Sequence, residues 1–168
     1  MSISEVGGGV TATELGIRNF SADTLLSDFN DGRGVAIRSG SVDPISGNLD
    51  PDADVDFTVS LHDGRSFDVD LAGAETVQDV LDAIKAAAGG IGLAVPGEFD
   101  AGLATDGNGI EFTDLTVGGD DLSIERRNNS TAAADLGIQG STAGATLAGT
   151  DRATVAVDGV FGHLKALR

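Results

Sequence analysis

The sequence predicts an α+β fold, in which a mostly antiparallel sheet carries one main amphipathic helix on one face and is flanked by a partial repeat. Two apolar–polar alternations surround Asp63-Gly64, apolar residues recur at helical spacing over residues 77–88, and one segment occurs twice, at 2–17 and at 123–138. The chain has 168 residues, 40% of them hydrophobic, which is enough to bury a core.

The repeated segment suggests how the chain is organised. Residues 2–17, SISEVGGGVTATELGI, align without a gap with residues 123–138, SIERRNNSTAAADLGI, and each copy ends on an acidic residue and Leu-Gly-Ile. In the second copy this tail is Leu136, Gly137 and Ile138. Self-similarity of this kind indicates a repeated structural unit. We therefore expect a piece of a longer protein, divided into the tail of a preceding repeat (1–17), an α+β domain (18–140), and a linker, a strand and the start of a truncated helix (141–168).

The first elements of the expected domain are short. Apolar spacing over residues 25–29 predicts about a turn and a half of helix, stopped by Asn30-Asp31-Gly32. Residues 34–38 are typical of a strand. Residues 39–54 are rich in Gly, Ser, Pro and Asp and are expected to form a loop, and a loop of this length is usually either functional or variable.

A β-hairpin is predicted around Asp63-Gly64. A two-residue turn would place apolar side chains opposite polar ones. A three-residue loop, ending at Gly64 in the left-handed conformation, instead pairs Val59 with Phe67 and Phe57 with Val69. The phase of the alternation therefore selects the three-residue loop.

The main helix is predicted from about residue 77 to residue 88. Thr76 is a suitable N-cap, Asp79 follows at the position of a capping box, and Gly89-Gly90 should end the helix. Its apolar face is formed by Val77, Val80, Leu81, Ile84 and Ala88. This face should cover the apolar side of the hairpin.

The rest of the chain predicts further strands joined by turns. Strands are expected at 93–103 and 110–113, joined by a turn at 105–109, and at 122–124. Residues 140–150 are small and polar and are expected to be a linker, followed by a strand over 154–160 and the start of a helix over 161–168.

Composition excludes several classes of function. The net charge of −17 repels phosphate backbones and anionic membrane surfaces, so we expect neither nucleic acid nor membrane as a partner. With no Cys, the chain has no disulfide, Cys-ligated zinc or thiol nucleophile. It also has no Trp or Tyr, the residues on which sugar-binding sites depend, which argues against a glycosidase.

The possible metal ligands are a run of alternating carboxylates. Asp52, Asp54 and Asp56 could converge on Ca²⁺, although an EF-hand would require Gly and Glu where this chain has Phe57 and Asp63. The simpler interpretation is a solvated strand face beside an acidic loop.

No motif supports catalysis. His62 is expected in the hairpin loop and His163 near the end of the sequence, and neither belongs to an acid–nucleophile pattern. Gly7-Gly8-Gly9 is not followed by the Lys-Ser/Thr of a phosphate-binding loop, and Arg126-Arg127 should form weak local ion pairs. We expect no catalytic residues and no cofactor.

Four segments together resemble the flagellin hook IN motif, a module of bacterial flagellar hook-associated proteins and some flagellins. These are LLSDFNDGRG at 25–34, TVQDVLDAI at 76–84, GIEFTD at 109–114 and AADLGI at 133–138. They occur in the order of the family and cover roughly residues 20–138. The proline- and aspartate-containing insertion at 39–54 departs from the family pattern. Residues 160–168 resemble the entry into the long C-terminal helix of hook-associated proteins of the hook–filament junction.

The resemblance implies a structural role outside the cell. It predicts an outward-facing middle domain of a hook–filament junction protein in the flagellum, with other axial proteins as partners of the full-length chain and a monomeric state for the isolated piece. A filament cap protein or a flagellin outer domain would carry the same motif. An alternative of another class is an extracellular adhesin-like module stabilised by calcium, which a Ca²⁺-dependent melting temperature would favour.

Overall fold

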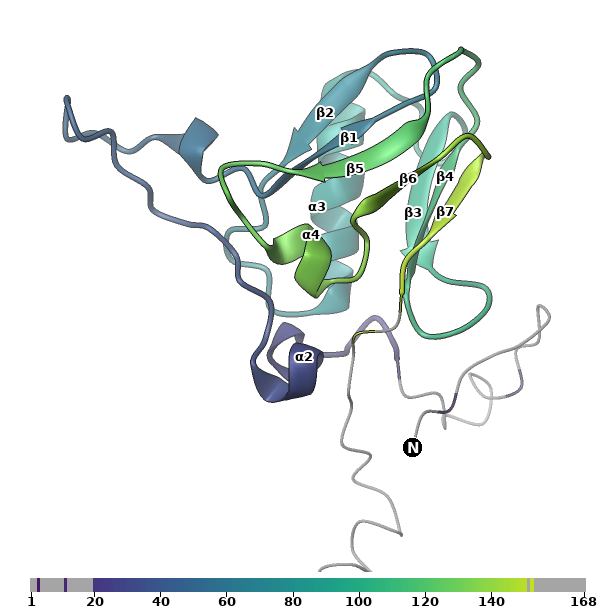
Figure 1. The fold of residues 1–168 in the computed structure, drawn as a ribbon, viewed down its shortest axis with the longest axis horizontal. Coiled ribbons are helices and arrows are strands. Elements are labelled where there is room, and N and C mark those ends of the chain that lie inside the picture. Colours follow the sequence, from purple (N-terminus) through teal and green to yellow (C-terminus); the bar gives the residue numbers. More distant parts are fainter. Residues whose placement is uncertain (1–2, 4–10, 12–19, 151, 153–168) are drawn as a thin grey trace, which may run out of the picture.

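The strands form two antiparallel sheets beside one long helix (Figure 1). The computed structural model describes residue 3, residue 11, residues 20–150 and residue 152. The first sheet has the order β2 (Ser66–Val69), β1 (Phe57–Ser60), β5 (Leu122–Arg126), β6 (Gly140–Thr142), and the second has the order β3 (Phe99–Leu103), β4 (Ile110–Asp114), β7 (Thr146–Ala148). The predicted α+β class with one main helix is confirmed, with its strands divided between two sheets.

The hairpin of β1 and β2 has the predicted register. Phe57 pairs with Val69 and Val59 with Phe67, and the loop between the strands has three residues. Gly64 has a φ of 84°, which is the left-handed conformation that this loop requires. Because the alternation and the turn length agree, one face of the hairpin is wholly apolar.

The main helix, α3 (Val77–Gly90), begins where the sequence predicts. The Thr76 side chain accepts a hydrogen bond from the Asp79 N–H, and the Asp79 carboxylate accepts one from the Thr76 N–H, which completes the capping box. The five residues of the predicted apolar face are all buried. The helix continues through Gly89 and Gly90 rather than ending before them, and its C-cap is Ile91.

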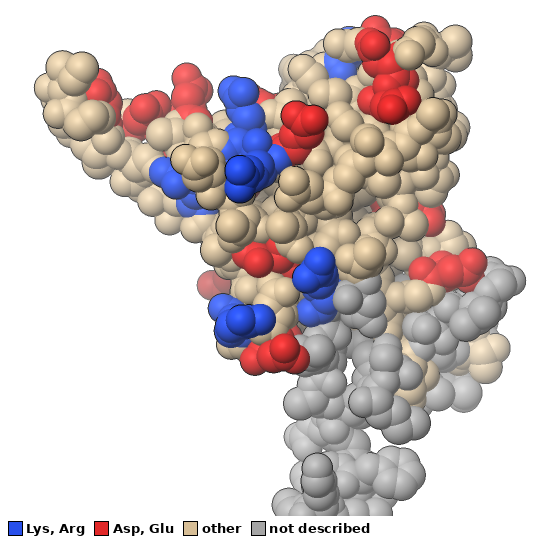
Figure 2. All heavy atoms as spheres, in the orientation of Figure 1, with Lys and Arg blue, Asp and Glu red and all other residues tan. Residues whose placement is uncertain are grey.

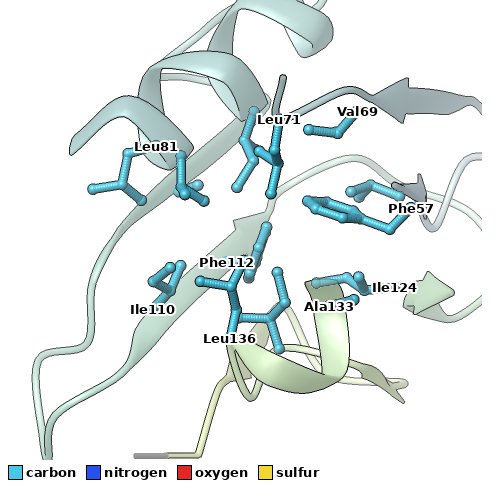
Figure 3. Close-up of a cluster of buried hydrophobic side chains, with 14 of the residues drawn as sticks. Phe57, Val69, Leu71, Leu81, Ile110, Phe112, Ile124, Ala133 and Leu136 are labelled. Atoms are coloured by element: carbon cyan, nitrogen blue, oxygen red, sulfur yellow. The ribbon is translucent and has the colours of Figure 1, made fainter. Parts of the chain in front are cut away.

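A single core joins the helix to both sheets (Figure 3). The Phe67 ring meets the Phe99 ring edge-on, with centroids 5.2 Å apart, so the two sheets contact each other directly. Leu136 and Ile138, from the tail of the second repeat copy, are also buried in this core. Each fully buried large apolar side chain contributes about 1.5–3 kcal/mol before entropy is counted.

Two predicted strands are absent or shorter. Residues 34–38 form no ladder, because side chains take their N–H groups: Asp135 accepts from Ala36 N–H and Asp56 from Arg38 N–H. Of residues 93–103, only Phe99–Leu103 is a strand. The preceding residues turn, and the Glu98 carboxylate accepts a hydrogen bond from the Ala94 N–H within that turn.

The linker expected over residues 140–150 instead forms two short strands, β6 and β7, which connect the two sheets. β6 pairs with β5 in one sheet, and β7 pairs with β4 in the other. Its residues are small and polar, so it carries no strand pattern, and its backbone hydrogen bonds hold it in place. Leu147 is its one side chain packed against the core.

Short elements complete the described chain. The predicted helical turn at 25–29 is a 3₁₀ helix, η1 (Leu26–Asp28), followed by α2 (Phe29–Gly32), within which Asn30 and Asp31 have positive φ. A second 3₁₀ turn, η2 (Pro51–Ala53), precedes β1. No helix among the described residues is both long enough and apolar enough to cross a membrane.

The second repeat copy is β5 followed by α4 (Ala132–Asp135) and the Leu-Gly-Ile tail. Gly137 has a φ of 74°, and a Cβ there would collide with the Thr150 carbonyl oxygen, so only glycine fits. The Leu-Gly-Ile tail therefore ends α4, and the backbone of Thr150 passes close to Gly137. Apart from residues 3 and 11, the first copy (2–17) lies outside the described residues, as do the glycine run at 7–9, His163 and the elements expected over 154–168.

Candidate interaction surface

Residues 39–50, here called the arm, project from the two-sheet body (Figure 1). The arm is a small hairpin with its own hydrogen bonds. Val42 and Leu49 form a β-bridge, the Asp43 N–H donates to the Asn48 carbonyl, and the Asp50 N–H donates to the Ser41 carbonyl. The arm therefore has a defined shape that its own backbone maintains.

The tip of the arm is held by Asp43. Its carboxylate accepts hydrogen bonds from the Ile45 N–H at 2.9 Å and from the Ser46 hydroxyl at 2.7 Å. The Ile45 N–H and then the Ser46 hydroxyl lower the pKa of Asp43 below its ordinary value, against a smaller effect of desolvation. Asp43 is therefore ionised at neutral pH while it fixes the turn.

The large apolar side chains of the arm are exposed. Ile45 is 95% exposed, Leu49 73% and Val42 52%. Three aliphatic side chains on so short a hairpin make an apolar patch without a partner among the described residues, bordered by the acidic residues seen along the arm in Figure 2. A cluster of exposed aliphatic side chains of this kind is a candidate contact site.

Two of the three candidate calcium ligands anchor the root of the arm. The Asp54 carboxylate accepts from the Ser41 N–H at 2.9 Å. Hydrogen bonds from the Ser41 hydroxyl lower the pKa of Asp54, against desolvation, and further ones from N–H groups and the charge of Arg38 add to the lowering. Asp56 is fully buried and accepts from the Arg38 N–H, the Leu71 N–H and the Ser130 hydroxyl.

The hydrogen bonds of Asp54 and Asp56 hold the arm to the body, so both carboxylates have a structural role. Asp52 is exposed in η2, and its backbone carbonyl accepts from the Asn128 side chain. The oxygens of Asp54 and Asp56 face N–H and hydroxyl donors of the protein itself. Among the described residues, no three His, Cys, Asp or Glu side chains are grouped as metal ligands.

The one described histidine lies where it was expected, in the hairpin loop, but it has a partner that the sequence did not reveal. His62 Nδ1 lies 2.7 Å from Asp114 Oδ2, and the His62 N–H donates to the same oxygen at 2.8 Å. Asp114 also accepts from the hydroxyl and the N–H of Thr116. Burial opposes ionisation of Asp114 most strongly, but the Thr116 and His62 hydrogen bonds together outweigh it and lower the pKa of Asp114.

The pair of His62 and Asp114 fastens the two sheets together, because His62 follows β1 and Asp114 ends β4. Gly118 allows its own backbone to pass close to that of His62, since a Cβ at position 118 would collide with the His62 carbonyl oxygen. Residues 62 and 114 are far apart in the sequence, and neither lies in a motif that would pair them. Of the two arginines expected to form local ion pairs, Arg127 has its Nη2 atom 3.8 Å from Asp68 Oδ2.

A groove lies beside η1 and α2. Two charged residues line it, Arg33 and Glu75. The rest of its side-chain lining is mostly apolar and comes from Leu25, Leu26, Val35, Ile37 and Ala74. The volume of the groove is about 460 Å³, and Leu25 is 47% exposed. Sequence reasoning did not find this groove, because its residues come from the predicted strand at 34–38, which the structure lacks, and from two other segments.

The chain enters and leaves the domain at one place. The Phe20 ring packs edge-on against Phe29, with centroids 6.1 Å apart, and the neighbouring Asn30 N–H donates to the Arg152 carbonyl at 3.1 Å. Figure 1 shows these ends of the described chain together at the bottom, whereas the arm points away at the left.

Comparison with known proteins gives no relative: no family model, no curated protein and no solved structure matches this chain.

Proposed function

We propose that this chain is a structural part of the bacterial flagellum: the outward-facing middle domain of a hook-associated protein at the hook–filament junction. The observation that carries the proposal furthest is the position of the two ends of the described chain. Phe20 and Arg152, at these two ends, both contact α2, while the arm extends away from them.

A domain with adjacent ends is suited to insertion between two halves of another structure. Because entry and exit are close, the inserted domain leaves the rest of the longer chain nearly undisturbed. An axial protein that polymerises through its N- and C-terminal helices needs this property of an outer domain. The four family-like segments, found in family order, supply the second support.

The positions of those segments in the fold agree with a structural role. TVQDVLDAI supplies the capped start and buried face of α3, GIEFTD supplies β4, and AADLGI supplies α4 and the helix stop. Each segment is used for capping, packing or pairing. The buried aspartates and His62 likewise make bonds that hold elements of the domain to one another.

Immunogold labelling of intact cells with an antibody against this chain tests the proposal. We expect one band of label where hook meets filament, and antibody pre-absorbed with the purified chain should give none. Label at the filament tip would indicate the cap protein, and label along the filament would indicate flagellin. Label on the cell body would overturn the flagellar proposal and favour the adhesin-like alternative.

A further inference from the structure

We propose that the arm of one copy docks into the groove beside η1 and α2 of a second copy, so that neighbouring domains touch head to tail. The proposal rests on the proposed function, because an axial protein holds its copies side by side. It names the contact that the outer domains would add.

The arm is built as a ready-made ligand. Its exposed aliphatic residues, Val42, Ile45 and Leu49, stand on a hairpin whose turn is closed by Asp43 and whose root is tied to Asp54. Binding by a preformed element loses little conformational entropy, which leaves more of the contact energy for affinity.

The groove offers the matching chemistry. Its floor is aliphatic, and Leu25 exposes much of its surface there. Arg33 borders it, and its Nε donates to the Asn30 carbonyl at 3.0 Å. The ion pairs of the described residues do not include Arg33, and its positive charge is complementary to the ionised Asp43 of an arriving arm. Glu75 also borders the groove, and the side chains of Ser46 and Asn48 on the arm can donate hydrogen bonds to a carboxylate.

The arm and the groove are different patches, so the contact is heterologous. A contact of that kind leaves one free arm and one free groove at the ends, and it continues into a ring or a helical array. The root of the arm follows Ile37, which lines the groove of its own copy. The arm nevertheless extends away from α2, beside which the groove lies (Figure 1). Within the described chain, the arm of the same copy therefore does not fill the groove.

The docked area is small, so the contact should be weak between free molecules. Interfaces well below about 1,200 Å² of total buried surface are transient. Neighbours held in an array face one another at effective concentrations of the order of millimolar, where a weak contact is occupied. A monomer at micromolar concentration is therefore compatible with the proposal.

Cross-linking tests the contact, and the absence of native Cys makes each introduced thiol unique. Ile45→Cys protein is mixed with Leu25→Cys protein at about 1 mM, with a short thiol-specific cross-linker. The matched control replaces Ile45→Cys by Val117→Cys, because Val117 is equally exposed, at 93%, but lies in another loop. We expect the arm–groove pair to form heterodimers about tenfold faster than the control pair, a difference of about 1.4 kcal/mol.

A charge variant sharpens the test. Asp43→Asn keeps an oxygen acceptor for the turn and removes the charge, and Arg33→Gln removes its proposed partner. Either change should bring the cross-linking rate of the arm–groove pair towards that of the control. Equal rates for arm–groove and control pairs would overturn the proposal, and so would a concentration-independent intramolecular cross-link in an Ile45→Cys/Leu25→Cys double variant.

The two proposals fail separately. Label at the hook–filament junction without preferential cross-linking would retain the flagellar role and remove the docking. Preferential cross-linking with label elsewhere would retain the contact and reassign the assembly in which it occurs.

Discussion

The body and the arm use the same kinds of residue in opposite ways. In the body, the aliphatic face of α3 is buried, and α3 contacts both sheets. The Asp79 carboxylate caps this helix, and the buried carboxylates of Asp56 and Asp114 accept hydrogen bonds within the fold. In the arm, aliphatic side chains face solvent while a carboxylate and backbone groups hold the shape. The difference indicates that stability resides in the body and that the arm is shaped for contact. Substitutions of buried residues in the body should therefore unfold the domain, whereas substitutions of exposed residues in the arm should leave it folded.

The largest effect is expected from placing a charge on the buried face of α3. Ile84→Asp puts an unpaired carboxylate in the core and should cost about 3–5 kcal/mol of unfolding free energy, enough to unfold a marginal domain. Urea denaturation followed by circular dichroism measures it. Ala86→Asp, on the exposed side of the same helix, is the matched control and should cost below about 1 kcal/mol. Equal costs would mean that α3 does not bury this face.

A smaller effect is expected where the arm meets the body. Asp56→Ala leaves the Arg38 and Leu71 N–H groups without their acceptor and should cost about 2–4 kcal/mol. Asp52→Ala, four positions earlier and exposed, should change stability by less than about 0.5 kcal/mol. Chemical denaturation of both variants and the wild type measures these changes in unfolding free energy. Similar small losses for both would show that Asp56 is not the anchor.

The bond between the sheets should give the body a defined pH dependence. Because the folded pKa of Asp114 lies below its ordinary value of 3.8, ionised Asp114 stabilises the fold above that pH, and the contribution is lost as the pH falls through the folded pKa. Asp114→Asn should cost about 1.5–3 kcal/mol at pH 7.

The measurement is urea denaturation of wild type and variant from pH 7 down to pH 3. We expect the difference in unfolding free energy between wild type and variant to narrow below about pH 4. It should disappear as the pH falls through the folded pKa of Asp114, where the wild-type carboxyl also becomes neutral. Asp121→Asn, at an exposed position, should track the wild type throughout. A gap that stays constant with pH would contradict the charge-based role of Asp114.

The sequence predicts the body well where two local signals agree. Periodicity and capping residues together locate α3, and alternation with turn length together set the β1–β2 register. It fails at residues 34–38 and 140–150 because long-range partners decide them. Aspartate side chains take the N–H groups of the first segment, and neighbouring strands recruit the second despite its polar composition.

The candidate surface is predicted only in outline. The sequence identifies residues 39–54 as a loop, but its three aliphatic residues have no periodicity, so nothing local says whether they face the core or solvent. The spacing of Asp52, Asp54 and Asp56 shows carboxylates but not their partners, which come from Ser41, Arg38, Leu71 and Ser130. The groove and the pair of His62 and Asp114 exist only once distant segments have packed.

The most direct test of the division between body and arm is the unfolding free energy of an Ile45→Ser/Leu49→Ser double variant, measured in urea. The account predicts a change within about 0.5 kcal/mol, because both side chains are already in solvent. The same variant should lose the preferential cross-linking that the arm shows when Asn48→Cys carries the thiol. A loss of about 2 kcal/mol or more would show that these residues are buried in the folded protein, and it would contradict the account.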